Sequence, residues 1–113
     1  MNKERVLHIH NQLEKLALCR EGILKPELLD SAIEGQQWYD NIFDKYLHVA
    51  SSINAYHIFN DGNKRTCYII IKDLAEYRYY FDEDKLSDLI LSLAKSEISK
   101  DTFMEKAKEC IRV

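Results

Sequence analysis

The chain has 113 residues, of which 46% are apolar and 31% charged, and its formal net charge is −3. This composition excludes a disordered tail, and no apolar run approaches the ~20 residues that a transmembrane helix needs. The weakly acidic balance argues against a protein that binds nucleic acid directly. Three cysteines without close spacing, and an N-terminus without a signal-peptide pattern, favour one cytoplasmic domain over residues 1–113 that makes no membrane contact.

Glycine and proline are the scarcest structural signals in the chain. Three glycines and one proline occur, where average usage gives about eight and six. Because both residues interrupt helices and build turns, their scarcity predicts an all-α fold.

Apolar residues recur every three or four positions in six stretches, which predict about six helices. In chain order the stretches span residues 6–17, 26–33, 42–56, 67–77, 86–93 and 103–111. Gly22 and Gly35 are the expected stops after the first two helices. Asp84 is the expected N-cap of the fifth helix, and Ser99 or Asp101 that of the sixth.

The segment between the third and fourth predicted helices contains an unusual set of polar residues: His57-Ile58-Phe59-Asn60-Asp61-Gly62-Asn63-Lys64-Arg65-Thr66. It opens a helix, whose first backbone N–H groups and positive dipole end attract anions. Gly62 allows a tight turn and a close approach of the backbone to a ligand. Asn63, Lys64 and Arg65 add hydrogen-bond donors and positive charge at the same place. Together with Gly62 they are the candidate phosphate ligands.

Three further residues of this segment have distinct expected roles. Asp61 offers the hard carboxylate oxygen that Mg²⁺ prefers when it bridges phosphates. His57 titrates nearest to neutral pH, so it is the candidate acceptor of a proton from an attacking hydroxyl. Phe59, a single aromatic among polar neighbours, is expected to anchor the loop in the core. The set as a whole predicts phosphoryl-transfer chemistry with Mg²⁺. For each residue alone, an ordinary cap, turn or solvated side chain is the simpler interpretation.

The segment resembles the signature of the Fic/Doc (Fido) superfamily, His-x-Phe-x-Asp/Glu-Gly-Asn-Gly-Arg-x-x-Arg. The resemblance implies a Fido fold with a short flap and with the motif loop at the N-terminus of a central helix. Carried over by position, it implies His57 as the base, Asp61 as the Mg²⁺ ligand, and Gly62, Asn63, Lys64 and Arg65 as phosphate ligands.

Within the superfamily the chain is similar to the Doc branch, the toxins of Phd–Doc toxin–antitoxin modules. Lys64 stands where AMP-transferring members have Gly, and Tyr68 stands where they have a second Arg. The Doc pattern is associated with a reversed nucleotide that presents its γ-phosphate. The resemblance therefore implies a phosphotransferase toxin that blocks translation by modifying a hydroxyl of elongation factor Tu. The alternatives are AMP transfer to a protein hydroxyl and a non-catalytic module that binds an antitoxin.

Self-restrained Fic proteins carry an inhibitory helix of the form Ser/Thr-x-x-x-Glu-Gly/Asn. The two Glu-Gly pairs of this chain, at residues 21–22 and 34–35, follow Ala17 and Asp30 at the position that needs Ser or Thr. An unrestrained toxin needs a separate inhibitor, so we expect a Phd-like antitoxin segment that folds on binding.

Three weaker signals complete the sequence-based expectations. Gln37, Trp38 and Tyr39 lie where we place the family's β-hairpin flap, which docks a target by strand addition. His8 and His10, two positions apart, are expected to be surface histidines, because such side chains point to different sides of a helix. His48 is expected to be a satisfied core histidine, with contact to the motif loop as the alternative.

Overall fold

The computed structural model describes residues 1–112, which form six α-helices, two short 3-10 helices and no sheet. This confirms the all-α prediction. The α-helices are α1 (Lys3–Lys15), α2 (Pro26–Gly35), α3 (Ile42–Tyr56), α4 (Asn63–Lys72), α5 (Glu83–Ala94) and α6 (Lys100–Glu109), and the 3-10 helices are η1 (Gln36–Trp38) and η2 (Asp73–Tyr77). No helix of the described residues is long and apolar enough to cross a bilayer.

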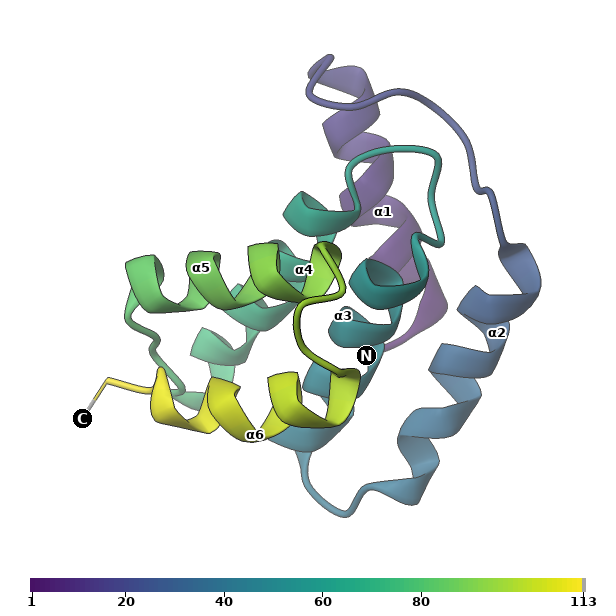
Figure 1. Cartoon of the computed structure of the whole chain (residues 1–113). Coiled ribbons are helices and arrows are strands. Elements are labelled where there is room, and N and C mark those ends of the chain that lie inside the picture. Colours follow the sequence, from purple (N-terminus) through teal and green to yellow (C-terminus); the bar gives the residue numbers. More distant parts are fainter. Residues whose placement is uncertain (113) are drawn as a thin grey trace.

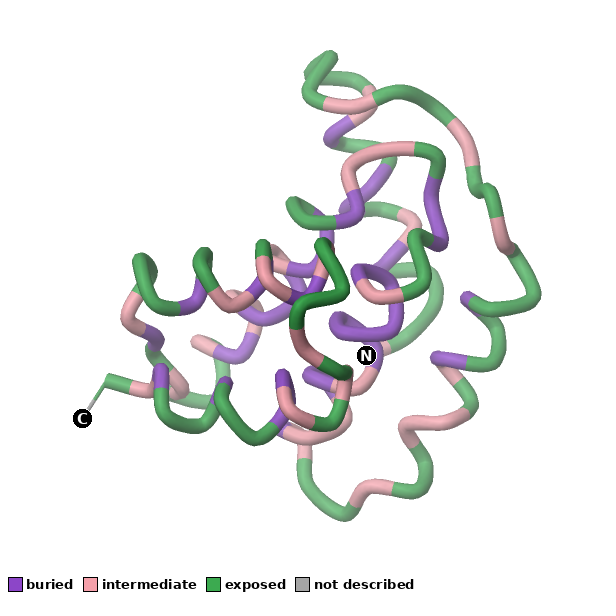
Figure 2. The backbone as a smooth tube through the Cα atoms, viewed as in Figure 1, coloured by how far each residue is buried: buried purple, intermediate pink, exposed green. Residues whose placement is uncertain are grey.

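Helix α3 is the centre of the fold and contacts α2, α4, α5 and α6. Figure 1 shows α5 and α6 side by side on one side of α3, with α2 on the other. The buried residues follow the inner faces of these helices (Figure 2). Fully buried side chains of α3 and α4 dominate the centre of this core: Leu47, Val49, Ala50, Ile53, Cys67, Ile70 and Ile71. The motif loop therefore joins the two most deeply packed helices of the molecule.

The helix ends follow local chemistry, and several of the expected boundaries are corrected. The stretch predicted over residues 67–77 is α-helical only to Lys72, and Asp73–Tyr77 continues it as the 3-10 helix η2. The first helix ends at Lys15, well before Gly22, and Ala17 takes the left-handed conformation that closes it. The Leu18 N–H then donates to the Leu13 carbonyl at 2.9 Å, the bond expected of such a helix end. The fifth helix is capped by Asp82 rather than Asp84, and the Asp82 side chain accepts from the Lys85 N–H. Ser99 caps α6, as one of the two expectations had it.

Gly35 is the last residue of α2, but it has a right-handed φ of −63°. The structure gives this glycine another role, because a Cβ atom here would lie 2.6 Å from Nε2 of His48. His48 Nδ1 accepts from the Lys100 ammonium at 2.6 Å, so Nε2 carries the imidazole hydrogen. That Nε2 atom is buried and has no hydrogen-bond partner among the described residues. His48 is thus a half-buried histidine between α2 and α6 rather than the satisfied core histidine that was expected, because only one of its two ring nitrogens has a partner among the described residues.

The environment of His48 predicts a pH dependence of stability. Burial and the facing Lys100 ammonium lower the pKa of His48 from 6.5 to about 4. Between these two pH values the unfolded chain binds more protons than the folded chain, so the free energy of unfolding falls as pH falls from about 6.5 to about 4. Because His48→Gln keeps an acceptor for Lys100 but does not titrate, we expect it to reduce this pH dependence.

The measurement is urea unfolding at a series of pH values across that window. The exposed His8 serves as the matched control, and His8→Gln should keep the wild-type pH dependence. An equal pH dependence in wild type and His48→Gln would contradict the assignment.

Candidate functional site

The motif loop, residues 57–62, connects α3 to α4 by two left-handed residues. His57 ends α3 with φ 50° and ψ 58°, and Gly62 precedes α4 with φ 77°. The left-handed conformation is favourable for glycine but costs energy for histidine, and such strain is typical of functional positions. The loop thus leaves α3 and enters α4 by sharp turns, and His57 lies at the first of them.

The inner side of the loop is built into the core. Phe59 is 1% exposed and its ring stacks on the imidazole of His10, with 3.9 Å between ring centroids and 8° between planes. Asn63 accepts from the Phe59 N–H and donates to the Phe59 carbonyl, both at 2.9 Å. These two bonds satisfy both backbone groups of Phe59. They also fix the orientation of the Asn63 side chain, whose amide has a second N–H beyond the one donated to Phe59.

The outer side of the loop lines a cavity of about 360 Å³. His57, Asp61, Gly62, Asn63, Lys64 and Arg65 all border it. The structure thus brings the proposed base, metal ligand and phosphate ligands to one place. Gln37, Trp38 and Tyr39 do not border this cavity.

The first turn of α4 provides an anion-binding end to this cavity. The first backbone hydrogen bond of α4 is donated by the Thr66 N–H to the Gly62 carbonyl, at 2.9 Å. Gly62 has no side chain to cap the N–H groups of Asn63, Lys64 and Arg65. The Arg65 guanidinium donates to the Leu18 carbonyl at 2.8 Å and has further N–H groups for a ligand.

Asp61 is held as a carboxylate at the edge of the cavity. The Arg20 N–H donates to Asp61 Oδ2 at 2.9 Å, and this bond, followed by that from the Gly62 N–H, lowers the pKa of Asp61. The nearby Arg20 and Arg65 charges act in the same direction, with Arg20 Nε 3.8 Å from Oδ2. An ionised carboxylate beside an anion site fits Mg²⁺, which takes one or two protein carboxylates and otherwise phosphates and water. The described residues contain no cluster of three or more His, Cys, Asp or Glu side chains that could hold a metal ion.

Asn54 is a cavity residue that the sequence analysis did not single out. It is fully buried on α3, and its amide donates to the Ile90 carbonyl at 2.9 Å. Its Oδ1 atom is buried and has no hydrogen-bond partner within residues 1–112. The cavity wall therefore retains one buried acceptor that a bound molecule or water can satisfy. No motif signalled this residue, because a lone Asn inside a helical stripe has many structural explanations.

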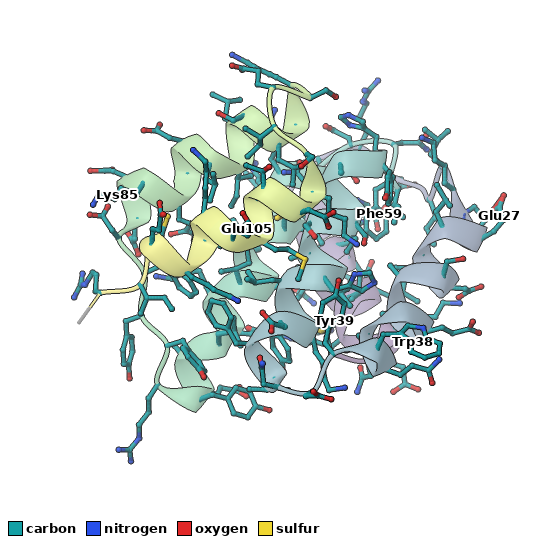
Figure 3. All side chains as sticks on the ribbon, turned by 60° about the horizontal axis from the view of Figure 1, so that its bottom comes forward. Glu27, Trp38, Tyr39, Phe59, Lys85 and Glu105 are labelled. Carbon is teal, nitrogen blue, oxygen red and sulfur yellow. The ribbon has the colours of Figure 1, made fainter. Side chains whose placement is uncertain are left out.

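The prediction of a β-hairpin flap at residues 37–39 beside the motif loop is wrong, both in the conformation of these residues and in their position. Gln36–Trp38 forms a 3-10 turn instead of a hairpin, and Trp38 is 81% exposed. This turn precedes α3, whereas the motif loop follows it, and a helix of 15 residues is about 22 Å long. Figure 1 shows the two connections at opposite ends of α3, and Figure 3 shows Trp38 on the outside of the molecule near α2.

The segment that lies beside the motif loop is instead the connection between α1 and α2. Ile23 forms an antiparallel bridge with Phe59, and the Leu24 N–H donates to the Ile58 carbonyl at 2.8 Å. The Asn60 N–H donates to the Gly22 carbonyl at 3.1 Å. Gly22 has φ 108°, and a Cβ atom there would lie 2.5 Å from Asn60 Nδ2. Because a φ of 108° is strained for any residue with a side chain, the turn beside the motif loop requires this glycine, which does not stop α1.

An apolar groove of about 530 Å³ adjoins the motif cavity, and Leu18, Lys64 and Arg65 border both. The groove lies between the end of α1, the outer side of α4 and α5. Its apolar wall is formed by Leu13, Leu18, Tyr68, Ile69, Ile90 and Leu91. Tyr68, the position where AMP-transferring relatives have a second Arg, therefore borders apolar space.

The comparison with protein-family models assigns residues 1–75 of the chain to the family described as Fic/DOC. The match includes α1, α2, α3, α4 and the whole motif loop. No curated protein matches the chain.

The double hydrogen bond of Asn63 predicts that this side chain stabilises the fold. We expect Asn63→Ala to lower the free energy of unfolding by about 1–3 kcal/mol, because two buried backbone groups lose their partner. Asn60→Ala removes one exposed bond, to the Glu21 carbonyl at 3.0 Å, and should cost less than about 1 kcal/mol. Urea unfolding of the two variants measures both values. Equal losses would show that Asn63 does not hold the loop.

Proposed function

Because the chain belongs to the Fic/DOC family, we propose that it is an ATP- and Mg²⁺-dependent phosphotransferase that modifies a hydroxyl of a protein target. The observation that carries the proposal is the convergence of His57, Asp61 and the cationic start of α4 on one cavity. This set contains the parts that phosphoryl transfer needs: a base, a metal ligand and an anion site. The proposed target is elongation factor Tu, and the proposed role is that of a Doc-type toxin that blocks translation.

In this mechanism the residues of the loop position the nucleotide and the target. The N–H groups at the start of α4, with Lys64 and Arg65, bind phosphate oxygens and offset their charge. Asp61 would hold Mg²⁺, which neutralises charge on the phosphates when bound. The oxygen of the target hydroxyl forms a bond to the γ-phosphorus, and His57 accepts the proton of that hydroxyl. At the same time the bond between the γ-phosphorus and the bridging β–γ oxygen breaks, and ADP leaves.

The apolar groove favours this orientation over AMP transfer. For AMP transfer the α-phosphate must lie at His57, and the β- and γ-phosphates need a polar site beyond it. The neighbouring space is instead the groove, where Lys64 and Arg65 lie only at the border with the motif cavity. Its other walls are mainly apolar, with Tyr68, Ile69 and Leu91 among them, and suit a base better than a pyrophosphate. With the base in the groove and the phosphates towards the motif loop, the γ-phosphate is the one nearest to His57.

The test uses the purified chain, Mg²⁺ and elongation factor Tu, with ATP labelled at either the γ- or the α-phosphorus. We expect transfer of the γ label alone, and at least about a hundredfold slower transfer by His57→Ala, because a general base contributes about that much or more. The exposed residue His8 is the matched control, and His8→Ala should react like wild type. Transfer of the α label would identify a nucleotidyl transferase instead. A folded chain that transfers neither label would favour the non-catalytic binding module.

We also propose that a Phd-like antitoxin segment neutralises the chain by lying in the apolar groove. Leu18 and Leu91 are 48% and 40% exposed there, as is typical of a groove that takes an amphipathic helix. Such a helix would occupy the space proposed for the base of ATP, and Lys64 and Arg65 at the border would favour acidic residues in it.

The proposed antitoxin predicts a growth phenotype, and it predicts that binding depends on the apolar groove. Expressed alone, the chain should arrest bacterial growth, and a co-expressed antitoxin should relieve the arrest. We expect Leu91→Lys to reduce antitoxin binding at least tenfold, because a charge replaces an apolar contact. Trp38 is exposed and lies in η1, at the end of α3 away from the motif loop, so Trp38→Lys should leave antitoxin binding unchanged. A chain that is harmless by itself and for which no neutralising protein exists would contradict the proposal.

A further inference from the structure

His10 lies directly behind the motif loop, although the spacing of the two N-terminal histidines predicted that both are on the surface. His8 is exposed, but His10 is 3% exposed. The buried positions of α1 are Val6, Ile9, His10 and Leu13. Thus His10 belongs to the inner face of the helix, four residues after Val6 and three before Leu13, and this spacing could have indicated its burial.

The imidazole of His10 contacts the motif loop with both its face and its edge. Its face stacks on the Phe59 ring, and Nε2 lies 2.9 Å from the carbonyl oxygen of Asp61. Because a carbonyl only accepts, Nε2 carries the hydrogen and donates it to Asp61. The proposed metal ligand is therefore held on both sides: its carbonyl by His10 and its carboxylate by the Arg20 N–H.

Glu14 lies close to both His10 and the connection between α1 and α2. Its Oε2 atom lies 3.6 Å from His10 Nδ1 and accepts from the Gly22 N–H at 2.9 Å. Cys19 closes the remaining space, because a Cβ atom on Gly62 would lie 2.9 Å from Cys19 Sγ and 3.6 Å from His10 Nε2. The inner side of the loop thus contacts α1 and the connection that follows it, and a cavity of about 440 Å³ remains beside His10, Glu14 and Phe59.

We infer that His10 is a positioning residue, which fixes the backbone of Asp61 so that the carboxylate faces the phosphate end of the cavity. The inference rests on the proposed function, since it assigns to Asp61 the metal that the phosphotransferase needs. His10 does not border the cavity, so its effect on the site is exerted through the residues that it contacts, above all Asp61 and Phe59.

Two substitutions separate the donor of His10 from its ring. His10→Phe keeps a ring to stack on Phe59 but has no N–H for Asp61, whereas His10→Gln keeps an amide N–H near the Nε2 position. His8→Phe is the matched control on the same helix. Asp61→Asn reports the contribution of the metal ligand itself.

The first readout is binding of Mn²⁺ with ATP, followed by electron paramagnetic resonance. We expect His10→Phe to weaken Mn²⁺ binding about three- to tenfold, the effect of losing one hydrogen bond, and His10→Gln to recover most of the loss. His8→Phe should bind like wild type, and Asp61→Asn should bind least. Unchanged Mn²⁺ affinity in His10→Phe would overturn the inference.

The second readout does not depend on the metal. Amide hydrogen exchange by NMR compares Phe59 and Asn60, whose N–H groups bond to Asn63 and Gly22, with core amides of α3. A loss of positioning accelerates the loop amides alone, whereas general destabilisation accelerates both sets. If wild type binds no Mn²⁺ with ATP, the proposed function fails, and this comparison alone decides the role of His10. Loop amides that keep their wild-type ratio to the core amides in His10→Phe would overturn it.

Discussion

The burial of Phe59 is the constraint on which the site depends. A loop that leaves α3 through a strained His57 and enters α4 through Gly62 has few contacts of its own to maintain its shape. Phe59 supplies them, because its ring is fixed between the core and His10 while its backbone is fixed by Asn63. With the inner side of the loop held in this way, the polar side chains on its outer side are presented to the cavity in a defined arrangement.

The motif divides its polar residues between structure and chemistry. Asn63 and the backbone of Phe59 satisfy one another in the interior, whereas Asp61, Lys64 and Arg65 remain on the side of the cavity. This division explains how a short segment can be both a folding element and a candidate active site.

The connection between α1 and α2 completes the site from a distant part of the sequence. It supplies the Arg20 N–H to Asp61, the Leu18 carbonyl to Arg65, and the Gly22 carbonyl to Asn60. Such contacts join two irregular segments through backbone groups, which any residue possesses. They are therefore not visible as a sequence pattern, and this is why the flap was expected at Gln37–Tyr39 instead.

The sequence by itself determined the helical class, the course of the six helices and the residues of the motif loop. Apolar spacing and the scarcity of glycine and proline act locally along a chain, so they can be recognised without a structure. Only the tertiary structure decided that His10 is buried against Phe59, that Gly35 makes room for His48, and that Tyr68 borders an apolar groove. These outcomes depend on which helix faces which, and that is set by the packing of side chains far apart in the sequence.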